Sequence, residues 1–316
     1  MKIKMFIVSS IFSAAVLLKV TDVRAADQVL LFDNFDSYAD SIAFSNVWNE
    51  VLASKITGTL TSATNVSAPN SVSYDTTGTN RNGRSFTETG LPAATNAITF
   101  SFDFYDSNAA LSPYRQFVNL QDGASPGVSV QLIAMGLNNN LSSTAEGGNY
   151  YMARLLGLAG NTGGTVSAFF KLNDAAAPLR STGWHNLKVV ITDTEFKFYV
   201  DSILSKTVPN TGTLRSYDVV RLGSGLSSVA VANFDNVLVS IPGIAGPSLG
   251  IALLSNNEVV ISWPTNATDF VLETNSNLNT TNWVAVTNVP VVVNDQNTVT
   301  NSITNSTGFY RLKKAE

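Results

Sequence analysis

Carboxylates that share acid–base chemistry must lie close together, and on a β-strand this is met most easily by acidic residues on the same face, two or four positions apart. The only acidic pair two positions apart is Asp193 and Glu195, which lies in a polar turn between two apolar runs. A turn tip is solvated, so we interpret this pair as a polar turn and not as the acid and base of an enzyme.

The chain has a single histidine, His185, which follows Trp184 at the start of an apolar run. The chain has no cysteine and the sequence places no acid beside this histidine, so it forms neither a nucleophilic triad nor a transition-metal site. We interpret His185 as a structural residue and predict that the protein is not an enzyme.

Side chains suited to binding sugars gather in the middle of the chain. Sugar recognition needs aromatic faces for stacking and amide or guanidinium groups for the hydroxyls. The alternative is that the tyrosines are half-buried packing residues, as is common in β-proteins. The candidate ligand-binding residues are Tyr114, Arg115, Asn119, Gln121, Gln131, Tyr151 and Arg154.

The N-terminus has the pattern of a secretory signal peptide. Lys2 and Lys4 precede an apolar run at 5–18, and small residues end the segment at Ala25. We predict that residues 1–25 are cleaved, and that the mature chain has no transmembrane segment and is secreted or held at the cell surface. The net charge of −4 argues against nucleic acid as a partner.

Alternating apolar and polar residues predict an all-β protein. The run 183–201 alternates on both sides of the polar turn 192–194, which indicates a hairpin with one buried face. Residues 98–105 alternate in the same way. About 13 such strands over residues 26–241 favour two curved sheets packed face to face as a jelly roll.

A second, smaller domain follows a short linker. Residues 242–247 contain two prolines and two glycines without charge, which is typical of an extended linker. Residues 248–316 carry several short apolar strands, with Trp263 and Trp283 inside two of them. We predict a small immunoglobulin- or fibronectin-like β-sandwich, with both tryptophans in its core.

The hairpin resembles a known family. It opens with Trp184-His185 and ends with Tyr199-Val200-Asp201, as laminin G-like domains of the concanavalin A-like lectin/glucanase superfamily do. The segments 31–38 and 234–237 are similar to the opening and closing strands of such jelly rolls, and residues 248–316 are similar to a short C-terminal module of secreted bacterial proteins. Ser202 departs from the family, which often has glycine there, so the following turn is in doubt.

The resemblance also implies a metal and a place for the ligand. Jelly-roll modules of this kind often hold a structural Ca²⁺ between their first and last strands, which here carry Asp33, Asp36 and Asp235. The alternative is that Asp36 and Asp235 accept hydrogen bonds from turn amides. The superfamily often binds sugars on its concave sheet, where the candidate binding residues would then lie.

The sequence therefore predicts a secreted, non-catalytic protein that binds a glycan or cell-surface polysaccharide. One alternative is a divergent polysaccharide hydrolase or lyase, in which Asp103, Glu146 and Glu88 would have to meet on the concave face. The other is a structural surface or matrix protein that binds protein partners. Because one fold hosts many functions, the resemblance alone does not separate the three.

Overall fold

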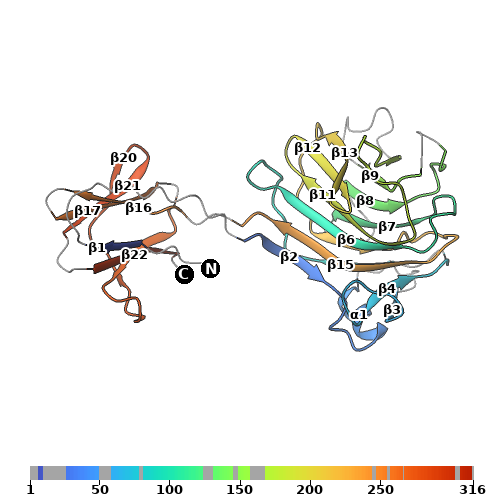
Figure 1. Ribbon diagram of the computed structural model, residues 1–316, viewed down its shortest axis with the longest axis horizontal. Helices are drawn as coiled ribbons and strands as arrows, with labels where there is room; N and C mark the ends of the chain where they lie inside the picture. The colour runs from blue at the N-terminus through green and yellow to red at the C-terminus, as the bar shows by residue number, and fades with distance from the viewer. Residues whose placement is uncertain are drawn as a thin grey trace. The chain divides into compact units, whose positions relative to one another are not determined.

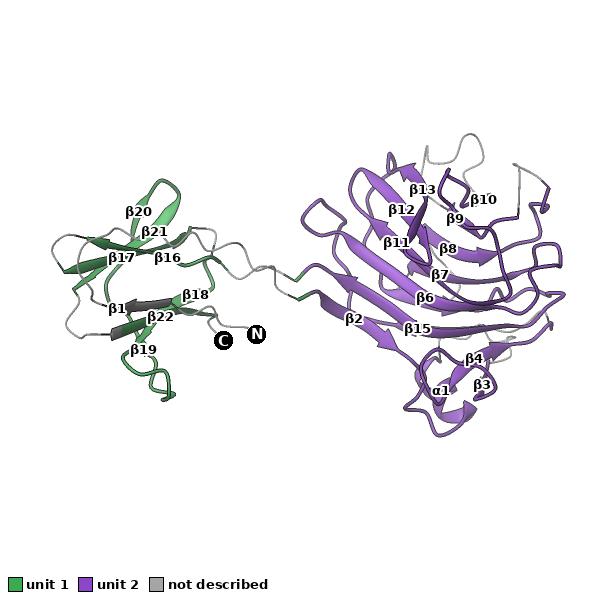
Figure 2. Ribbon diagram, viewed as in Figure 1, with its two compact units in different colours: residues 1–26, 243–316 green, residues 27–242 purple. Residues whose placement is uncertain are grey.

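The computed structural model divides the chain into two compact units (Figure 2). The larger unit spans residues 27–242, and the smaller one combines 243–316 with 1–26. These limits lie close to the predicted domain ends at 241 and 248. The structure describes residues 6–9, 26–49, 58–77, 81–123, 131–144, 149–156, 168–243, 247–254, 257–265, 267–302 and 307–314.

One layer of the larger unit is an eight-stranded antiparallel sheet (Figure 1). The strand order is β13-β12-β11-β6-β15-β4-β3, and β2 pairs with residues 237–241 at the C-terminal end of β15. The strands are β2 (Gln28–Asp33), β3 (Thr59–Thr61), β4 (Ser71–Tyr74), β6 (Ile98–Asp106), β11 (Gly183–Ile191), β12 (Glu195–Val200), β13 (Ile203–Pro209) and β15 (Ala232–Ile241).

The second layer is a six-stranded antiparallel sheet in the order β10-β9-β8-β7-β14-β5. Part of one predicted strand, residues 128–130, lies outside the described residues. The strands are β5 (Asn82–Ser85), β7 (Gln116–Asp122), β8 (Gln131–Leu137), β9 (Met152–Leu156), β10 (Phe169–Lys171) and β14 (Val219–Leu222).

The two layers share one apolar core. On β6, Phe100, Phe102 and Phe104 are fully buried, and they face inward because alternate residues of a strand point to the same side. Val118 and Leu120 of β7 belong to the same cluster. The predicted all-β jelly-roll sandwich is confirmed, and the hairpin at 183–201 forms β11 and β12.

The turn after β12 contains Ser202, which stands where the sequence analysis left the turn open. Val200 pairs with Ile203, so Asp201 and Ser202 form a two-residue hairpin turn with φ of +50° and +68°. Such turns need positive φ at both central residues, which favours glycine at the second. Ser202 therefore adopts a left-handed conformation at a cost that glycine would not have.

A short helix, α1 (Ser41–Val47), closes one end of the larger unit. Asp40 caps it, because its carboxylate accepts from the amides of Ile42 and Ala43 at 3.0 and 2.8 Å. The helix buries Phe44, whose ring packs at 5.7 Å from that of Phe35. The described residues include no helix long and apolar enough to cross a membrane.

The smaller unit is a β-sandwich with its own core. Trp263 is buried there, as predicted, whereas Trp283 is half-buried beneath the guanidinium of Arg311, 4.2 Å from its ring centroid. One sheet is β1 (Phe6–Ser9), β22 (Thr307–Lys314), β18 (Phe270–Asn275) and β19 (Val284–Ala285). The other is β16 (Gly250–Leu254), β17 (Glu258–Pro264), β21 (Gln296–Ser302) and β20 (Val291–Val293).

Strand β1 lies within the predicted signal peptide. Phe6 pairs with Tyr310 and Ser9 with Thr307, so the segment adds an edge strand to β22. The remainder of 1–25 lies outside the described residues, and cleavage after Ala25 stays a prediction.

Candidate functional site

The six-stranded sheet has a second face, turned away from the core, which we call the outer face. On β7, Val118 and Leu120 point into the core, so Asn119 and Gln121 point outward. On β9, Leu155 is a core residue and Arg154 points outward. The outer face therefore collects polar side chains from adjacent strands.

Strand register places four of these positions in a single line across the sheet. Asn119 pairs with Arg221 of β14 on one side and with Ala134 of β8 on the other, and Ala134 pairs with Arg154. We call Arg221, Asn119, Ala134 and Arg154 the polar row. Neighbouring strands are about 4.8 Å apart, so Asn119 and Arg154 stand about 10 Å apart at the backbone.

Hydrogen bonding along the polar row is incomplete. Arg221 donates from Nη1 to Oε1 of Gln121 at 2.7 Å. Asn119 is only 2% exposed, yet its Oδ1 has no hydrogen-bond partner, and neither has Nε of Arg154, among the contacts described for these residues. A buried polar atom without a partner is costly, so these two atoms lack a partner that the fold would be expected to supply.

An apolar cluster lies beside the polar row on the same face. The Phe117 and Phe169 rings are 5.1 Å apart, and the Arg154 guanidinium lies 5.8 Å from the centroid of Phe169. Ala134 belongs to this cluster as well as to the row. Apolar surface with a few directed polar groups is the usual composition of a ligand site.

Three of the sequence-predicted binding residues meet on this face, namely Asn119, Gln121 and Arg154. Two others do not. Tyr114 and Tyr151 are 1% and 0% exposed and belong to the core, where no sugar ring can stack on them. Burial above all raises the pKa of both phenols. The structure thus places the two tyrosines in packing roles, which the sequence analysis had named as the alternative.

The last two predicted binding residues also lie apart from the polar row. Gln131 shares the core side of β8 with Ile133; its amide donates to the carbonyl of Thr213 at 2.6 Å. Arg115 precedes β7 and donates from Nε to Oδ1 of Asn139 at 2.8 Å. Conversely, sequence analysis missed Arg221, although its position between Val220 and Leu222, both in the core, signals an outward side chain.

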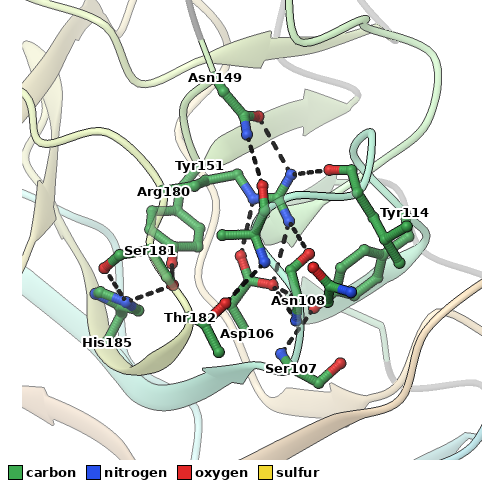
Figure 3. A network of polar contacts seen from close by, with 12 residues as sticks. Asp106, Ser107, Asn108, Tyr114, Asn149, Tyr151, Arg180, Ser181, Thr182 and His185 are labelled. Carbon is green, nitrogen blue, oxygen red and sulfur yellow. Dashed lines mark hydrogen bonds and ion pairs between the residues drawn. The ribbon is translucent and has the colours of Figure 1, made fainter.

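A buried ion pair organises the loops at one end of the sandwich (Figure 3). Arg180 donates from Nε to Oδ2 of Asp106 at 2.8 Å, and both side chains have no exposed surface. Asp106 also accepts from the hydroxyl of Tyr114 at 2.7 Å, and Arg180 reaches the carbonyl of Leu111 and Oδ1 of Asn149, each at 3.2 Å. Every charged group here has protein partners, which gives the pair a structural role.

His185 has an acidic neighbour, contrary to the sequence analysis. The hairpin brings Asp201 to it, with Oδ2 at 2.7 Å from Nδ1, while Nε2 lies 3.0 Å from Oγ of Ser181 (Figure 3 shows the Ser181 side). Nε2 also lies 2.9 Å from the carbonyl oxygen of Ser181. A carbonyl can only accept, so that contact needs a hydrogen on Nε2, whereas a general base needs Nε2 free. The contacts favour a structural role for His185 over a role in a catalytic triad.

The first of the predicted calcium ligands, Asp33, is engaged by protein donors. Its Oδ2 accepts from Nε1 of Trp48 at 2.9 Å, from the hydroxyl of Tyr38, and from Nη1 of Arg84 at 2.7 Å. Burial and this carboxylate raise the pKa of the Tyr38 phenol. A carboxylate surrounded by a guanidinium and two other donors does not fit as a ligand of a cation.

The other two carboxylates bind opposite parts of the loop 64–70. Asp235 accepts from the amides of Val66 and Ser67 at 2.8 and 2.9 Å, and Asp36 accepts from the amide of Asn70 at 2.8 Å. Burial raises the pKa of Asp235 against the effect of these amides. Within the described residues, no three His, Cys, Asp or Glu side chains form a possible metal site. The carboxylates fit turn amides, and calcium stays a prediction.

The acids that an enzyme would need do not converge where they are described. Asp103 lies on the eight-stranded sheet and accepts from the side-chain amides of Asn186 and Asn236, each at 2.8 Å. Glu88 follows β5 of the other sheet and accepts from the hydroxyl of Ser216. Glu146 lies outside the described residues.

The larger unit is therefore an all-β jelly roll whose six-stranded sheet has a partly polar outer face. No protein-family model and no curated protein matches the chain. Among solved structures it is similar to "Cellulose induced protein, Cip1", with 14% identity and a TM-score of 0.44, over 66% of this chain and 96% of that one.

Two further structures are similar over most of their length. An endo-1,3-β-glucanase from Streptomyces sioyaensis has 12% identity and a TM-score of 0.43, over 71% of this chain and 99% of that one. The β-agarase A from Zobellia galactanivorans has 11% identity and a TM-score of 0.42, over 69% and 93%. Membership of the concanavalin A-like superfamily and of its laminin G-like family stays a prediction, and so does the identity of the C-terminal module. Similarity this low carries no argument about what the chain binds.

Proposed function

We propose that this is an exported, non-catalytic protein that binds a glycan through the outer face of the six-stranded sheet. The observation that carries the proposal is the pair of unsatisfied buried atoms, Oδ1 of Asn119 and Nε of Arg154, in one row across Ala134. One is an acceptor and the other a donor, and the hydroxyl groups of a sugar can donate to the first and accept from the second.

The surroundings of the row support a sugar rather than a wholly apolar ligand. Phe169 offers an aromatic ring next to Arg154, and Gln121 adds an amide beside Arg221. Aromatic surface and directed amide or guanidinium groups together match the apolar and hydroxyl-bearing faces of a sugar ring.

The absence of catalysis is part of the proposal. Nε2 of His185 contacts both the hydroxyl and the carbonyl oxygen of Ser181. Asp103 lies on the eight-stranded sheet, whereas Glu88 follows β5 of the six-stranded sheet. A hydrolase or lyase would require a different acid and base to meet at the polar row. A structural role with protein partners is the remaining alternative.

Glycan-array binding tests the proposal, with the purified protein and its Asn119→Ala variant. Loss of a directed hydrogen bond weakens binding by about two- to tenfold. The control is Lys206→Gln on the opposite sheet, where Lys206 pairs with Asp174 at 3.1 Å and where we expect unchanged binding. If no glycan is retained, or if both variants bind like the parent, the proposed site is wrong.

Export and cleavage of the signal peptide are tested by the mass of the exported protein. The mass of the protein recovered outside the producing cell should correspond to a chain that begins at Ala26. A recovered chain that retains residues 6–9, and with them β1, would contradict cleavage at this position.

A further inference from the structure

One sheet edge of the smaller unit is filled by a strand from the predicted signal peptide. Strand β1 pairs antiparallel with β22, Phe6 with Tyr310 and Ser9 with Thr307, so that β22 lies between β1 and β18 (Figure 1). Cleavage of the signal peptide would remove the whole of β1. The backbone N–H and C=O groups on that side of β22 would then lose the partners that β1 supplies, which leaves an open sheet edge.

The pairing also shows what kind of strand this edge accepts. β1 has the sequence Phe-Ile-Val-Ser, three adjacent apolar residues followed by a small polar one. Its register with β22 runs through all four residues without a shift. The edge of β22 therefore accepts a short, apolar, antiparallel strand.

Another strand of the smaller unit has the same character and a free edge of its own. β20 is the last strand of its sheet, and in the described part of the chain it pairs only with β21. Its residues Val291, Val292 and Val293 are 64, 61 and 50% exposed. Sheets commonly protect such an edge with a charge or a proline in the strand, and β20 has neither. β20 is thus an apolar strand that can still pair on one side.

The turn after β20 determines which backbone groups face that side. Val293 pairs with Gln296 across the two-residue turn Asn294-Asp295, where φ is +49° and +59°. In such a hairpin the two residues that flank the turn exchange hydrogen bonds with each other, and the next pair does not. The N–H and C=O of Val292 therefore point away from β21, toward the free edge.

We infer that the mature protein associates with itself through the smaller unit, with β20 of one molecule taking the place of β1 on β22 of the next. The inference rests on the predicted cleavage, which belongs to the proposed function, and does not use the glycan site. Donor and acceptor are different strands, so the contact is heterologous and successive molecules form rings or open filaments. Such an assembly would bring several copies of the larger unit together, which raises avidity for a polymer.

Sedimentation velocity over a range of protein concentrations tests the inference. The two samples are the protein recovered outside the producing cell and the full chain 1–316, produced without export. We expect the exported protein to form larger species as its concentration rises. The full chain should stay a monomer, because β1 fills its acceptor edge.

A peptide supplies the same strand from outside the chain. A synthetic peptide of residues 4–11, which contains β1, should return the exported protein to a monomer. The control peptide carries Ile7→Pro and Val8→Pro and should have no effect, because proline has no N–H to donate to the ladder. This arm needs no variant of the protein and so does not depend on the folding of one.

Two substitutions at one position separate strand pairing from nonspecific apolar contact. Val292→Pro removes the N–H at the free edge and keeps the hydrogen bonds between β20 and β21, so it should abolish association. Val292→Thr makes the same exposed side chain polar but keeps the N–H, and association should stay within about fivefold of the parent. Equal loss in both variants would indicate apolar contact and overturn the inference.

The remaining outcomes separate this inference from the proposed function. An exported protein that stays monomeric at every concentration would overturn the inference, as would association that Val292→Pro or the peptide of residues 4–11 leaves unchanged. An exported chain that retains residues 6–9 would overturn it as well, because β1 would keep the edge of β22 filled. Glycan binding by a monomeric protein would leave the glycan site standing alone, and association without glycan retention would do the reverse.

Discussion

Replacing Arg180 by methionine should destabilise the larger unit strongly. Arg180 and Asp106 form an ion pair with no exposed side-chain surface, and Arg180 donates to both carboxylate oxygens, at 2.8 and 3.1 Å. Methionine fills part of the space but leaves Asp106 buried with only Tyr114 and the amide of Asn108 as donors. The carboxylate would then lack a compensating charge.

Breaking a buried pair from one side costs about 3–5 kcal/mol of unfolding free energy, mostly the penalty of the stranded charge. For a unit of this size, 1 kcal/mol shifts the melting temperature by about 2–4 °C, so we expect a fall of about 6–20 °C. The double variant Arg180→Met, Asp106→Asn removes the stranded charge and should recover part of the loss. We expect this recovery only if the uncompensated charge of Asp106 causes the loss of stability.

Differential scanning calorimetry is the suitable assay, because it can resolve the transitions of the two units. The matched control is Lys206→Met, whose partner Asp174 has a side chain that is 43% exposed; surface pairs contribute about 0–1 kcal/mol. A fall of less than about 3 °C for Arg180→Met would refute the reasoning. So would a double variant less stable than the single one, since packing and not charge would then dominate.

Because Asp36 and Asp235 already accept from backbone amides, we expect EDTA to leave the melting temperature unchanged; a clear fall that calcium reverses would support the calcium prediction instead. Burial raises the pKa of Tyr114 and Tyr151 above the ordinary value of about 10, so their contribution to stability is complete below pH 10 and is lost as pH rises beyond it. Absorbance at 295 nm should therefore report ionisation of these two only together with unfolding, and gradual titration before unfolding would contradict their burial. Ser202→Gly should raise the unfolding free energy by about 0.5–1 kcal/mol, because Ser202 has a φ of +68°; a loss of stability in urea titrations would show that the turn is unstrained.

Local alternation was enough to predict the main strands. Residues 98–105 and 183–201 have a period of two, and a strand with one buried face produces that pattern wherever it sits in the fold. They form β6, β11 and β12, with the predicted turn at 192–194. The all-β sandwich follows from such segments because each has an apolar face that only another sheet can cover.

The composition of the site depended on strand register, which the local sequence pattern does not give. Asn119, Gln121 and Arg154 were predicted together and do share the outer face. Tyr114 and Tyr151 were predicted beside them but lie in the core. Both tyrosines precede a strand, β7 or β9, so the side on which they lie depends on where that strand begins, and a shift of one position reverses the side of every strand residue.

Contacts between distant segments were decided by the tertiary structure alone. Arg221 lies opposite Asn119, 102 positions away in the sequence, only because β14 pairs with β7. In the same way, strand pairing across the hairpin turn brings Asp201 to His185, which the sequence analysis had left without an acid. The sequence determined the strands, because alternation is local; pairing and register decided which side chains meet, because those depend on the whole chain at once.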